Sequence, residues 1–220
     1  MRSISEVFRS YAVFDTQGRH VNGSDRQSNH AYGDAYEKVF SAPDYDGNVC
    51  SYQVGSSTRS CDKCGSDTSH FVTCPDFKWR SIRHEIKLML EVGTADGAGL
   101  LAWREIFPNA HVVGMDIHTC EHGHGDRLEF HLGDQRSRVD CERAAAGREF
   151  DFIVDDATHY LENTLLTYKW LWPFVKSGGV YVIEEFPGVD RVREYFPECE
   201  LVEAVSPFGG KEYLVVLRKQ

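Results

Sequence analysis

The amino-acid sequence predicts an α/β fold in which a mostly parallel sheet is covered by helices on both faces. From residue 87 onwards, short apolar runs alternate with amphipathic segments, which is the pattern of successive strand–helix units. The last two apolar runs, 200–205 and 212–218, are close in sequence and are joined through Pro207-Phe208-Gly209-Gly210. We therefore expect a seven-stranded sheet that ends in an antiparallel C-terminal hairpin.

Each element follows from its local pattern. Seven apolar runs of strand length occur, at 88–92, 111–116, 128–132, 150–156, 180–185, 200–205 and 212–218. Helical patterns fill four of the gaps between them, at 98–107, 138–147, 161–174 and 188–196. The third of these helices is expected to stop near Pro173 and the following Ser177-Gly178-Gly179. Upstream, Tyr36, Val39 and Phe40 fall on one side of a short predicted helix at 34–41.

Composition excludes several classes of protein. The 220 residues include 24 Lys plus Arg and 34 Asp plus Glu, and 41% of them are hydrophobic, so the chain is acidic and has enough apolar residues for a core. Nothing concentrates the basic residues, and we expect no nucleic-acid partner. No apolar run approaches the roughly 18 residues of a membrane-spanning helix, and the polar N-terminus does not resemble a signal peptide. The expected location is the cytoplasm.

The composition divides the chain into an N-terminal segment (1–43), a Cys-rich insertion (44–80) and a main domain (81–220). Four cysteines and one histidine stand in the insertion: Cys50, Cys61, Cys64, Cys74 and His70. Cysteines spaced as in C-x-x-C can share a tetrahedral Zn²⁺, with either four thiolates or three thiolates and His70 as ligands. The second C-x-x-C pair that usually accompanies such sites is missing. A structural zinc, a disulfide and free thiols therefore all stay open.

Acidic residues stand at the carboxyl ends of the predicted strands, where ligands bind in sheets of this kind. They are Glu91, Asp116, Asp155, Asp156, Glu184 and Glu185. The first strand also runs into a glycine loop with the pattern E-x-G-x-x-x-G-x-G, which includes Gly93 and Gly97. Glycines let the backbone turn sharply and approach a ligand closely. An acid at the end of the next strand, Asp116, can accept both hydroxyls of a ribose.

Carboxylates on neighbouring strand ends repel one another unless a positive charge lies between them. Asp156 follows the fourth strand, and Glu184 and Glu185 follow the fifth. Mg²⁺ prefers oxygen ligands, so a bound Mg²⁺ explains this concentration of acid, and solvated acids are the alternative. His159, three residues after Asp156, can take a proton near neutral pH, although a histidine at a helix start can also simply cap or pack.

Several of these motifs together resemble class I S-adenosylmethionine-dependent methyltransferases with a Rossmann-like fold. The stretches 90–117, 133–135 (GDQ) and 150–185 look like the metal-dependent sugar O-methyltransferases of macrolide biosynthesis, the macrocin and mycinamicin types, and their cephalosporin hydroxylase-like relatives. The N-terminal stretch 23–37 resembles the segment that covers the cofactor in that family. Ser24 and Arg26 depart from the usual Thr-Asp-Lys, Ala157-Thr158 from the usual Gly-Ser, and Glu185 from the usual Asp.

The resemblance implies roles for individual residues. Glu91, Gly93 and Gly97 would line the methionine end of S-adenosylmethionine, Asp116 would hold the ribose, and Asp134 and Gln135 would flank the adenine. Asp155 is also assigned to the cofactor, as is Tyr32, for which packing is an equal alternative. Asp156, Glu184 and Glu185 would bind Mg²⁺, and Asp156 and His159 would act in catalysis, with His159 as the general base.

The implied function is Mg²⁺-dependent O-methylation of a small-molecule hydroxyl, with a sugar, glycoside or other polyol first, in natural product biosynthesis. Related enzymes assemble as homo-oligomers, which is expected here too. Two alternatives remain from the sequence: a hydroxylase-like relative, and a zinc-stapled binding module that keeps the fold but has no turnover.

Overall fold

The computed structural model describes residues 1–14, 20–26, 30–43, 79–206 and 208–220, and the chain divides into two compact units. The first unit comprises Met1–Val39 and Arg83–Gln220, and the second comprises Phe40–Ile82. Within the second unit, β3 (Ser41–Pro43) pairs antiparallel with β4 (Trp79–Ser81). Cys50, Cys61, Cys64, Cys74 and His70 lie outside the described residues, so the zinc site stays a prediction.

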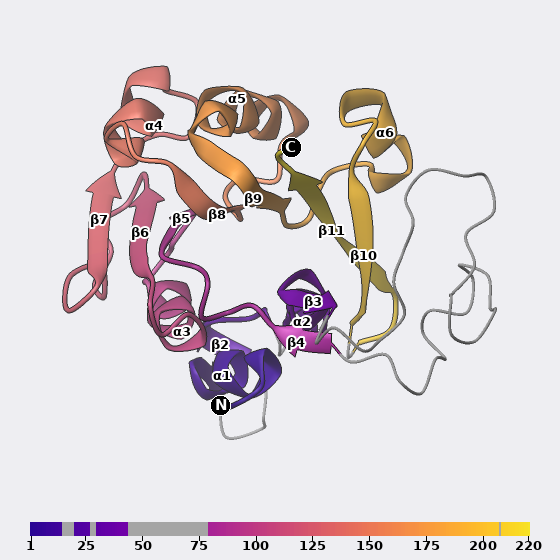
Figure 1. Ribbon diagram of the computed structural model, residues 1–220. Coiled ribbons are helices and arrows are strands. Elements are labelled where there is room, and N and C mark those ends of the chain that lie inside the picture. The colour runs from indigo at the N-terminus through magenta and orange to yellow at the C-terminus, as the bar shows by residue number, and fades with distance from the viewer. Residues whose placement is uncertain (15–19, 27–29, 44–78, 207) are drawn as a thin grey trace. The chain divides into compact units, whose positions relative to one another are not determined.

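The first unit contains the predicted seven-stranded sheet. Its strand order is β10-β11-β9-β8-β5-β6-β7 (Figure 1). The pairs among β5 to β9 are parallel, whereas β11 runs antiparallel to both β9 and β10. The predicted mostly parallel sheet with a C-terminal hairpin is therefore confirmed. The strands are β5 (Leu88–Val92), β6 (His111–Asp116), β7 (Leu128–Leu132), β8 (Phe150–Asp155), β9 (Val175–Ile183), β10 (Glu200–Val205) and β11 (Lys211–Arg218).

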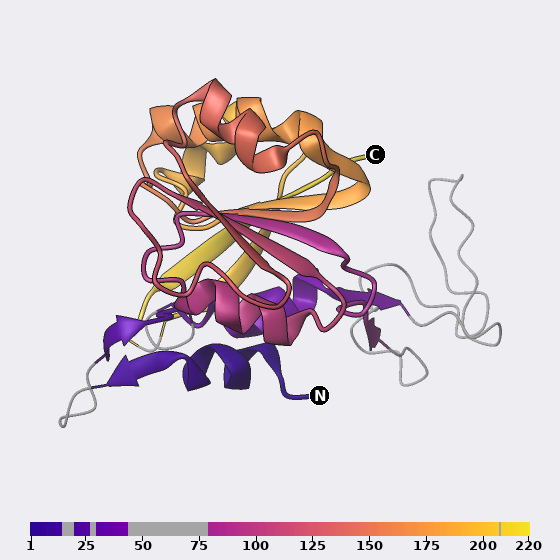
Figure 2. The same ribbon diagram turned by 90° about the vertical axis from the view of Figure 1, so that its left-hand side faces the viewer.

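Helices cover both faces of this sheet (Figure 2). One face carries α1 (Ile4–Ser10), α2 (Tyr32–Val39) and α3 (Ala98–Ile106). The other carries α4 (Arg138–Ala145), α5 (Leu161–Leu171) and α6 (Val192–Tyr195), together with 3₁₀ turns at Trp172–Phe174 and Val189–Arg191. None of the helices in the described parts of the chain is long and apolar enough to cross a membrane.

The main difference in the main domain concerns β9, which begins at Val175, five residues before the predicted start. The Ser-Gly-Gly stretch continues the strand as an extended segment, because Gly178 donates to the carbonyl of Lys219 (2.8 Å) and Lys219 donates to that of Gly179 (3.0 Å). Gly178 has a φ of +79°, a conformation that glycine adopts readily. Ser177-Gly178-Gly179 alone indicated a break, and the pairing that overrides it comes from 40 residues further along the chain.

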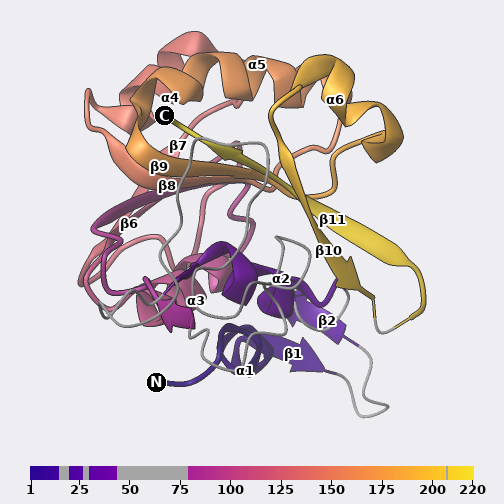
Figure 3. The same ribbon diagram turned by 45° about the vertical axis from the view of Figure 1, so that its right-hand side comes forward.

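The N-terminal segment is more ordered than its sequence indicates. A capping box between Ser3 and Glu6 begins α1, satisfying backbone N–H groups that the first helical turn leaves free. A hairpin follows, made of β1 (Ala12–Phe14) and β2 (His20–Gly23). Gly23 ends it with a φ of +79°, and a Cβ there would lie 2.1 Å from the carbonyl oxygen of Tyr11. At the edge of the sheet, α2 contacts the hairpin β10–β11 (Figure 3).

An aromatic cluster fills the space between α1, α2, α3 and the sheet. Trp103 of α3 is fully buried, with its ring edge-on to Phe8 and Tyr36 (both 4.9 Å between centroids) and to Phe152 of β8 (5.4 Å). Its indole nitrogen donates to Glu91 Oε1 at 2.9 Å. Edge-to-face pairs of this kind add to the stabilisation from burial. The N-terminal segment is thus part of the core.

We predict that Trp103→Ala destabilises the fold by about 3–5 kcal/mol, because it opens a cavity among the rings of Phe8, Tyr36 and Phe152 and removes a donor from a buried carboxylate. Urea unfolding followed by circular dichroism measures this. Val139→Ala is the control, since Val139 is 69% exposed on α4 and its truncation should change stability by less than about 0.5 kcal/mol. Equal midpoints for the two variants would contradict the assignment of Trp103 to the core.

Candidate functional site

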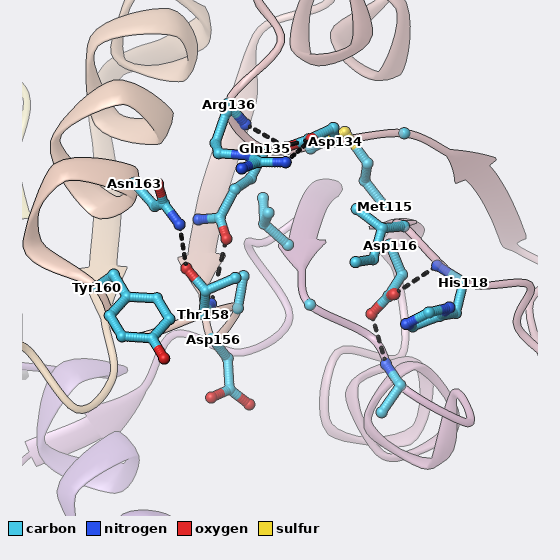
Figure 4. A pocket seen from close by; sticks show the side chains of 16 residues that line it. Met115, Asp116, His118, Asp134, Gln135, Arg136, Asp156, Thr158, Tyr160 and Asn163 are labelled. Carbon is cyan, nitrogen blue, oxygen red and sulfur yellow. Dashed lines mark hydrogen bonds and ion pairs between the residues drawn. The ribbon is translucent and has the colours of Figure 1, made fainter.

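The predicted chemical residues gather at the carboxyl ends of β5, β6, β8 and β9, as parallel strands require. A pocket of about 460 Å³ lies there (Figure 4). Five of the residues predicted from the sequence line it: Gly93, Asp116, Asp134, Gln135 and Asp156. The other lining residues are Val92, Ala95, Met115, Ile117, His118, Gly133, Arg136, Ala157, Thr158, Tyr160 and Asn163.

In the glycine loop, the backbone after β5 lies close to the backbone after β8. Gly93 has a φ of +87°, its N–H donates to the Met115 carbonyl at 2.8 Å, and a Cβ on it would lie 2.2 Å from the Asp156 carbonyl oxygen. Gly97 has a φ of +90° at the start of α3, where a Cβ would meet the Cys120 sulfur at 2.4 Å. Gly97 does not line the pocket. The glycine at 93 brings the β5 loop against the β8 loop and so defines one wall of the pocket.

Asp116 joins two loops at the edge of the pocket. Its Oδ2 accepts from the N–H of Ala95 (2.9 Å), and its Oδ1 accepts from the N–H of His118 (2.8 Å). These bonds hold the carboxylate in one orientation between the glycine loop and the loop after β6 (Figure 4). Each carboxylate oxygen has a second lone pair, so Asp116 can still accept hydroxyl protons from a ligand.

Asp134 and Gln135 lie on the opposite wall, with different surroundings. Arg136 holds the Asp134 carboxylate with its Nε (3.0 Å to Oδ1) and its terminal nitrogen (2.6 Å to Oδ2), and this lowers the pKa of Asp134. Gln135 is buried and bridges two elements, donating to Thr167 Oγ1 of α5 (2.8 Å) and accepting from the N–H of Thr158 (3.2 Å). Gln135 therefore fixes the turn after β8, a role that its sequence position does not reveal.

Three further residues that were assigned to the cofactor do not line this pocket. Glu91 is completely buried and faces Trp103 and Arg26. Asp155 is 2% exposed, and burial raises its pKa to about 7. Tyr32 is 1% exposed and stacks against the ring of His30 at 5.1 Å, in line with the packing alternative. The structure thus supports a smaller set of pocket residues than the resemblance implies.

A buried arginine from the N-terminal segment lies among the strand-end carboxylates. The terminal nitrogen of Arg26 lies 2.8 Å from Glu91 Oε1 and 2.6 Å from Asp156 Oδ2, and its Nε lies 2.8 Å from Glu184 Oε1. Tyr36 donates its hydroxyl to the same Glu184 oxygen. Burial and then the neighbouring Glu184 carboxylate raise the pKa of Asp156. Arg26 is the positive charge that the acidic strand ends require.

His159 and Glu185 face each other beside Asp156. His159 Nε2 lies 3.8 Å from Asp156 Oδ1 and 3.6 Å from Glu185 Oε2. Both residues have positive φ values, 53° for His159 and 49° for Glu185. Non-glycine residues rarely adopt this conformation, and it is concentrated at functional sites. One third of the His159 side chain is exposed.

A second histidine binds the other side of Glu185. His30 Nε2 lies 3.1 Å from Glu185 Oε1, and His30 Nδ1 lies 2.6 Å from Glu212 Oε2 of β11. Burial alone would lower the pKa of His30, but its hydrogen bonds to Asp25 and Glu212 outweigh this and raise the pKa to about 9. Nothing in the spacing of the sequence indicated this contact.

The predicted metal ligands divide into two groups. Glu184 Oε1 accepts hydrogen bonds from Arg26 and Tyr36. Asp156 Oδ1 and Glu185 Oε2 instead lie near His159. Within the described ranges, no group of three or more His, Cys, Asp or Glu residues is arranged to hold a metal ion. Mg²⁺ commonly binds one or two carboxylates and fills its other positions with water or substrate. Of the three predicted ligands, Asp156 and Glu185 keep carboxylate oxygens that are not bonded to Arg26 or Tyr36, and the predicted Mg²⁺ site stays a prediction.

The chain is similar in sequence to sugar O-methyltransferases of natural product biosynthesis. No family model matches the chain. It is 32% identical over 119 residues to demethylmacrocin O-methyltransferase of Streptomyces fradiae and 30% identical over 118 residues to mycinamicin VI 2''-O-methyltransferase of Micromonospora griseorubida. Each match covers 50% of this chain and 30% of the relative. The predicted resemblance to macrocin- and mycinamicin-type sugar O-methyltransferases is confirmed.

The chain also matches a solved structure. The MycE methyltransferase from the mycinamycin biosynthetic pathway, in complex with Mg and SAH, is 29% identical, with a TM-score of 0.44, over 52% of this chain and 30% of that chain. This chain thus matches less than a third of the length of these relatives.

We predict that Gly93→Ala disrupts the pocket far more than Gly147→Ala. Both glycines have positive φ values, but a Cβ at Gly147 meets nothing within 4 Å, whereas one at Gly93 collides with backbone. Gly147→Ala should cost about 1 kcal/mol, and Gly93→Ala should exceed it by about 2 kcal/mol or more. Chemical denaturation of the two variants compares them. Similar losses at both positions would mean that the close approach of the β5 and β8 loops is not a constraint.

Proposed function

We propose that the chain is an S-adenosylmethionine-dependent O-methyltransferase that acts on a hydroxyl of a small glycoside or other polyol. One observation carries this proposal. Asp156 lines the strand-end pocket and also lies beside His159, so a methyl donor held in the pocket ends next to an accessible base. The similarity to sugar O-methyltransferases supports the same reaction class.

The pocket offers groups that match the polar parts of the donor. Asp116, held by two backbone N–H groups, is placed to accept the ribose hydroxyls. Asp134 carries a carboxylate that can accept from the adenine amino group, with Arg136 keeping it ionised. Met115 and Ile117 provide apolar surface between these two acids in the pocket lining.

Methyl transfer from a sulfonium is an in-line displacement, and the acceptor hydroxyl must lose its proton as the new bond forms. His159 Nε2 takes that proton, because it is the accessible ring nitrogen that faces Asp156 and Glu185. The two carboxylates stabilise the imidazolium that results. The protein otherwise acts by holding the acceptor oxygen in line with the methyl group.

A bound Mg²⁺ also belongs to the proposal, with Asp156 and Glu185 as its ligands. When bound, such an ion lowers the pKa of a coordinated hydroxyl and orients it. Glu184 is not included among the ligands, because its carboxylate is held by Arg26 and Tyr36. The expected homo-oligomer, the cytoplasmic location and the absence of a nucleic-acid partner stay predictions.

We predict that Asp116→Asn weakens S-adenosylmethionine binding by about 10- to 100-fold, because hydrogen bonds to a charged group contribute about 1.5–3 kcal/mol. Isothermal titration calorimetry measures the affinity. Asp126→Asn is the matched control, because the side chain of Asp126 is 89% exposed and lies outside the pocket. If Asp116→Asn bound the cofactor as tightly as the control, Asp116 would not hold the ribose.

We predict that His159→Ala lowers kcat by about 10²- to 10⁴-fold, which is the contribution of a positioned base, while its affinity for S-adenosylmethionine stays within about twofold of wild type. Steady-state kinetics on a panel of glycosides and calorimetry separate the two effects. His84→Ala, at an exposed histidine, should leave both unchanged. Near-normal kcat in His159→Ala would remove the general-base role without touching the cofactor assignment.

A further inference from the structure

We define the inner half of the acidic strand ends as Glu91, Glu184 and Asp156 Oδ2. Arg26 lies among these groups. Its side chain is only 5% exposed, and its three close carboxylate contacts come from the ends of three different strands. The outer half, which we define as Asp156 Oδ1 and Glu185, faces His159 instead. Asp156 belongs to both halves, with one oxygen in each.

We propose that Arg26 is a resident cation of this site, and that it sets a low affinity of the strand-end carboxylates for divalent metal ions. This inference rests on the proposed function only through the two-carboxylate Mg²⁺ site at Asp156 and Glu185. It concerns metal affinity, and a binding measurement can test it without turnover.

Packing, rather than the carboxylates alone, fixes the position of Arg26. Its guanidinium lies 5.4 Å from the ring centroid of Trp103 and 5.7 Å from that of Phe8. Both rings are fully buried in the aromatic cluster. A planar guanidinium held between aromatic faces and carboxylates is strongly constrained in orientation. Arg26 therefore cannot move aside easily when another cation approaches.

The geometry puts Arg26 in competition with a metal ion. Asp156 Oδ2 and Glu184 Oε1, which belong to two of the three predicted metal ligands, are bonded to guanidinium nitrogens. A divalent ion bound by the remaining oxygens of these groups would lie within a few ångströms of a fixed positive charge. At low effective dielectric this repulsion is large. The ion is thereby restricted to the outer half, at Asp156 Oδ1 and Glu185.

The carboxylates of the inner half also carry more negative charge than Arg26 alone neutralises. Glu91 Oε2 is buried and has no hydrogen-bond partner among the described residues. Three carboxylates around a single guanidinium leave an excess of negative charge, which removal of Arg26 would enlarge. A divalent ion is the simplest replacement for the lost charge, because its preferred ligands are carboxylate oxygens.

The test is titration of Mn²⁺ into the full chain, monitored by electron paramagnetic resonance of the free ion. Arg26→Met keeps an apolar side chain between Phe8 and Trp103 but removes the charge, and it should bind Mn²⁺ at least about tenfold more tightly than wild type. Arg26→Lys keeps the positive charge and should bind Mn²⁺ less tightly than Arg26→Met. Equal or weaker binding by Arg26→Met would overturn the proposal.

Further variants locate the ion and separate the two hypotheses. Adding Glu184→Gln to Arg26→Met should abolish the gain, because the new ion would use the inner half. If wild type binds no Mn²⁺ and Arg26→Met does, the inference stands and the Mg²⁺ part of the proposed function fails. If wild type and Arg26→Met bind Mn²⁺ equally, the inference fails and the Mg²⁺ part of the proposed function stands. S-adenosylmethionine calorimetry on the same samples reports on the cofactor site independently.

Folding of the variants is followed by thermal melts with and without Mn²⁺. An Arg26→Met protein that is stable only with Mn²⁺ supports the proposal, because the ion then replaces the lost charge. Arg26→Gln, which retains polar groups, is the second variant. If neither variant folds with Mn²⁺ present, the inner half cannot accept a metal ion in place of Arg26, and the proposal is wrong.

Discussion

The arrangement at the strand ends depends on one buried guanidinium. Parallel strands bring Glu91, Asp156 and Glu184 to the same edge of the sheet, where three carboxylates would repel one another. Arg26 neutralises part of that charge, and it comes from a segment that is remote in sequence. The ion cluster therefore attaches the N-terminal segment to the sheet and also leaves Asp156 Oδ1 and Glu185 directed at His159.

The sheet was predictable because its determinants are local. β5, β6, β7 and β10 begin and end where the apolar runs do, and β8 and β11 each differ by one residue. The start of β9 was wrong because its pairing with residues near Lys219 is not visible in Ser177-Gly178-Gly179 itself. α1, β1 and β2 also went unpredicted. For α1 the reason is similar, because Phe8 packs against Trp103, which lies far along the chain.

The site was predictable in residue type and less so in geometry. Position at a strand end placed Gly93, Asp116 and Asp156 in the pocket, because topology alone fixes that edge. The direction in which each side chain points could not be predicted in the same way. Glu91 and Glu184 follow strands as expected, yet their carboxylates turn to Arg26, which the sequence marked only as a departure from a usual lysine. Gln135 could not be recognised as a brace for Thr158, because that contact joins separate loops.

The long sequence separation of Arg26 and Glu184 also affects the chain while it is being translated. These partners are 158 residues apart, and His30 reaches further still, to Glu212 on β11, 182 residues away. During translation, residues 1–39 leave the ribosome well before their partners exist. Their apolar side chains, Phe8 and Tyr36 among them, are synthesised before the residues that bury them. Nascent chains should therefore be most vulnerable to aggregation until those residues have been made.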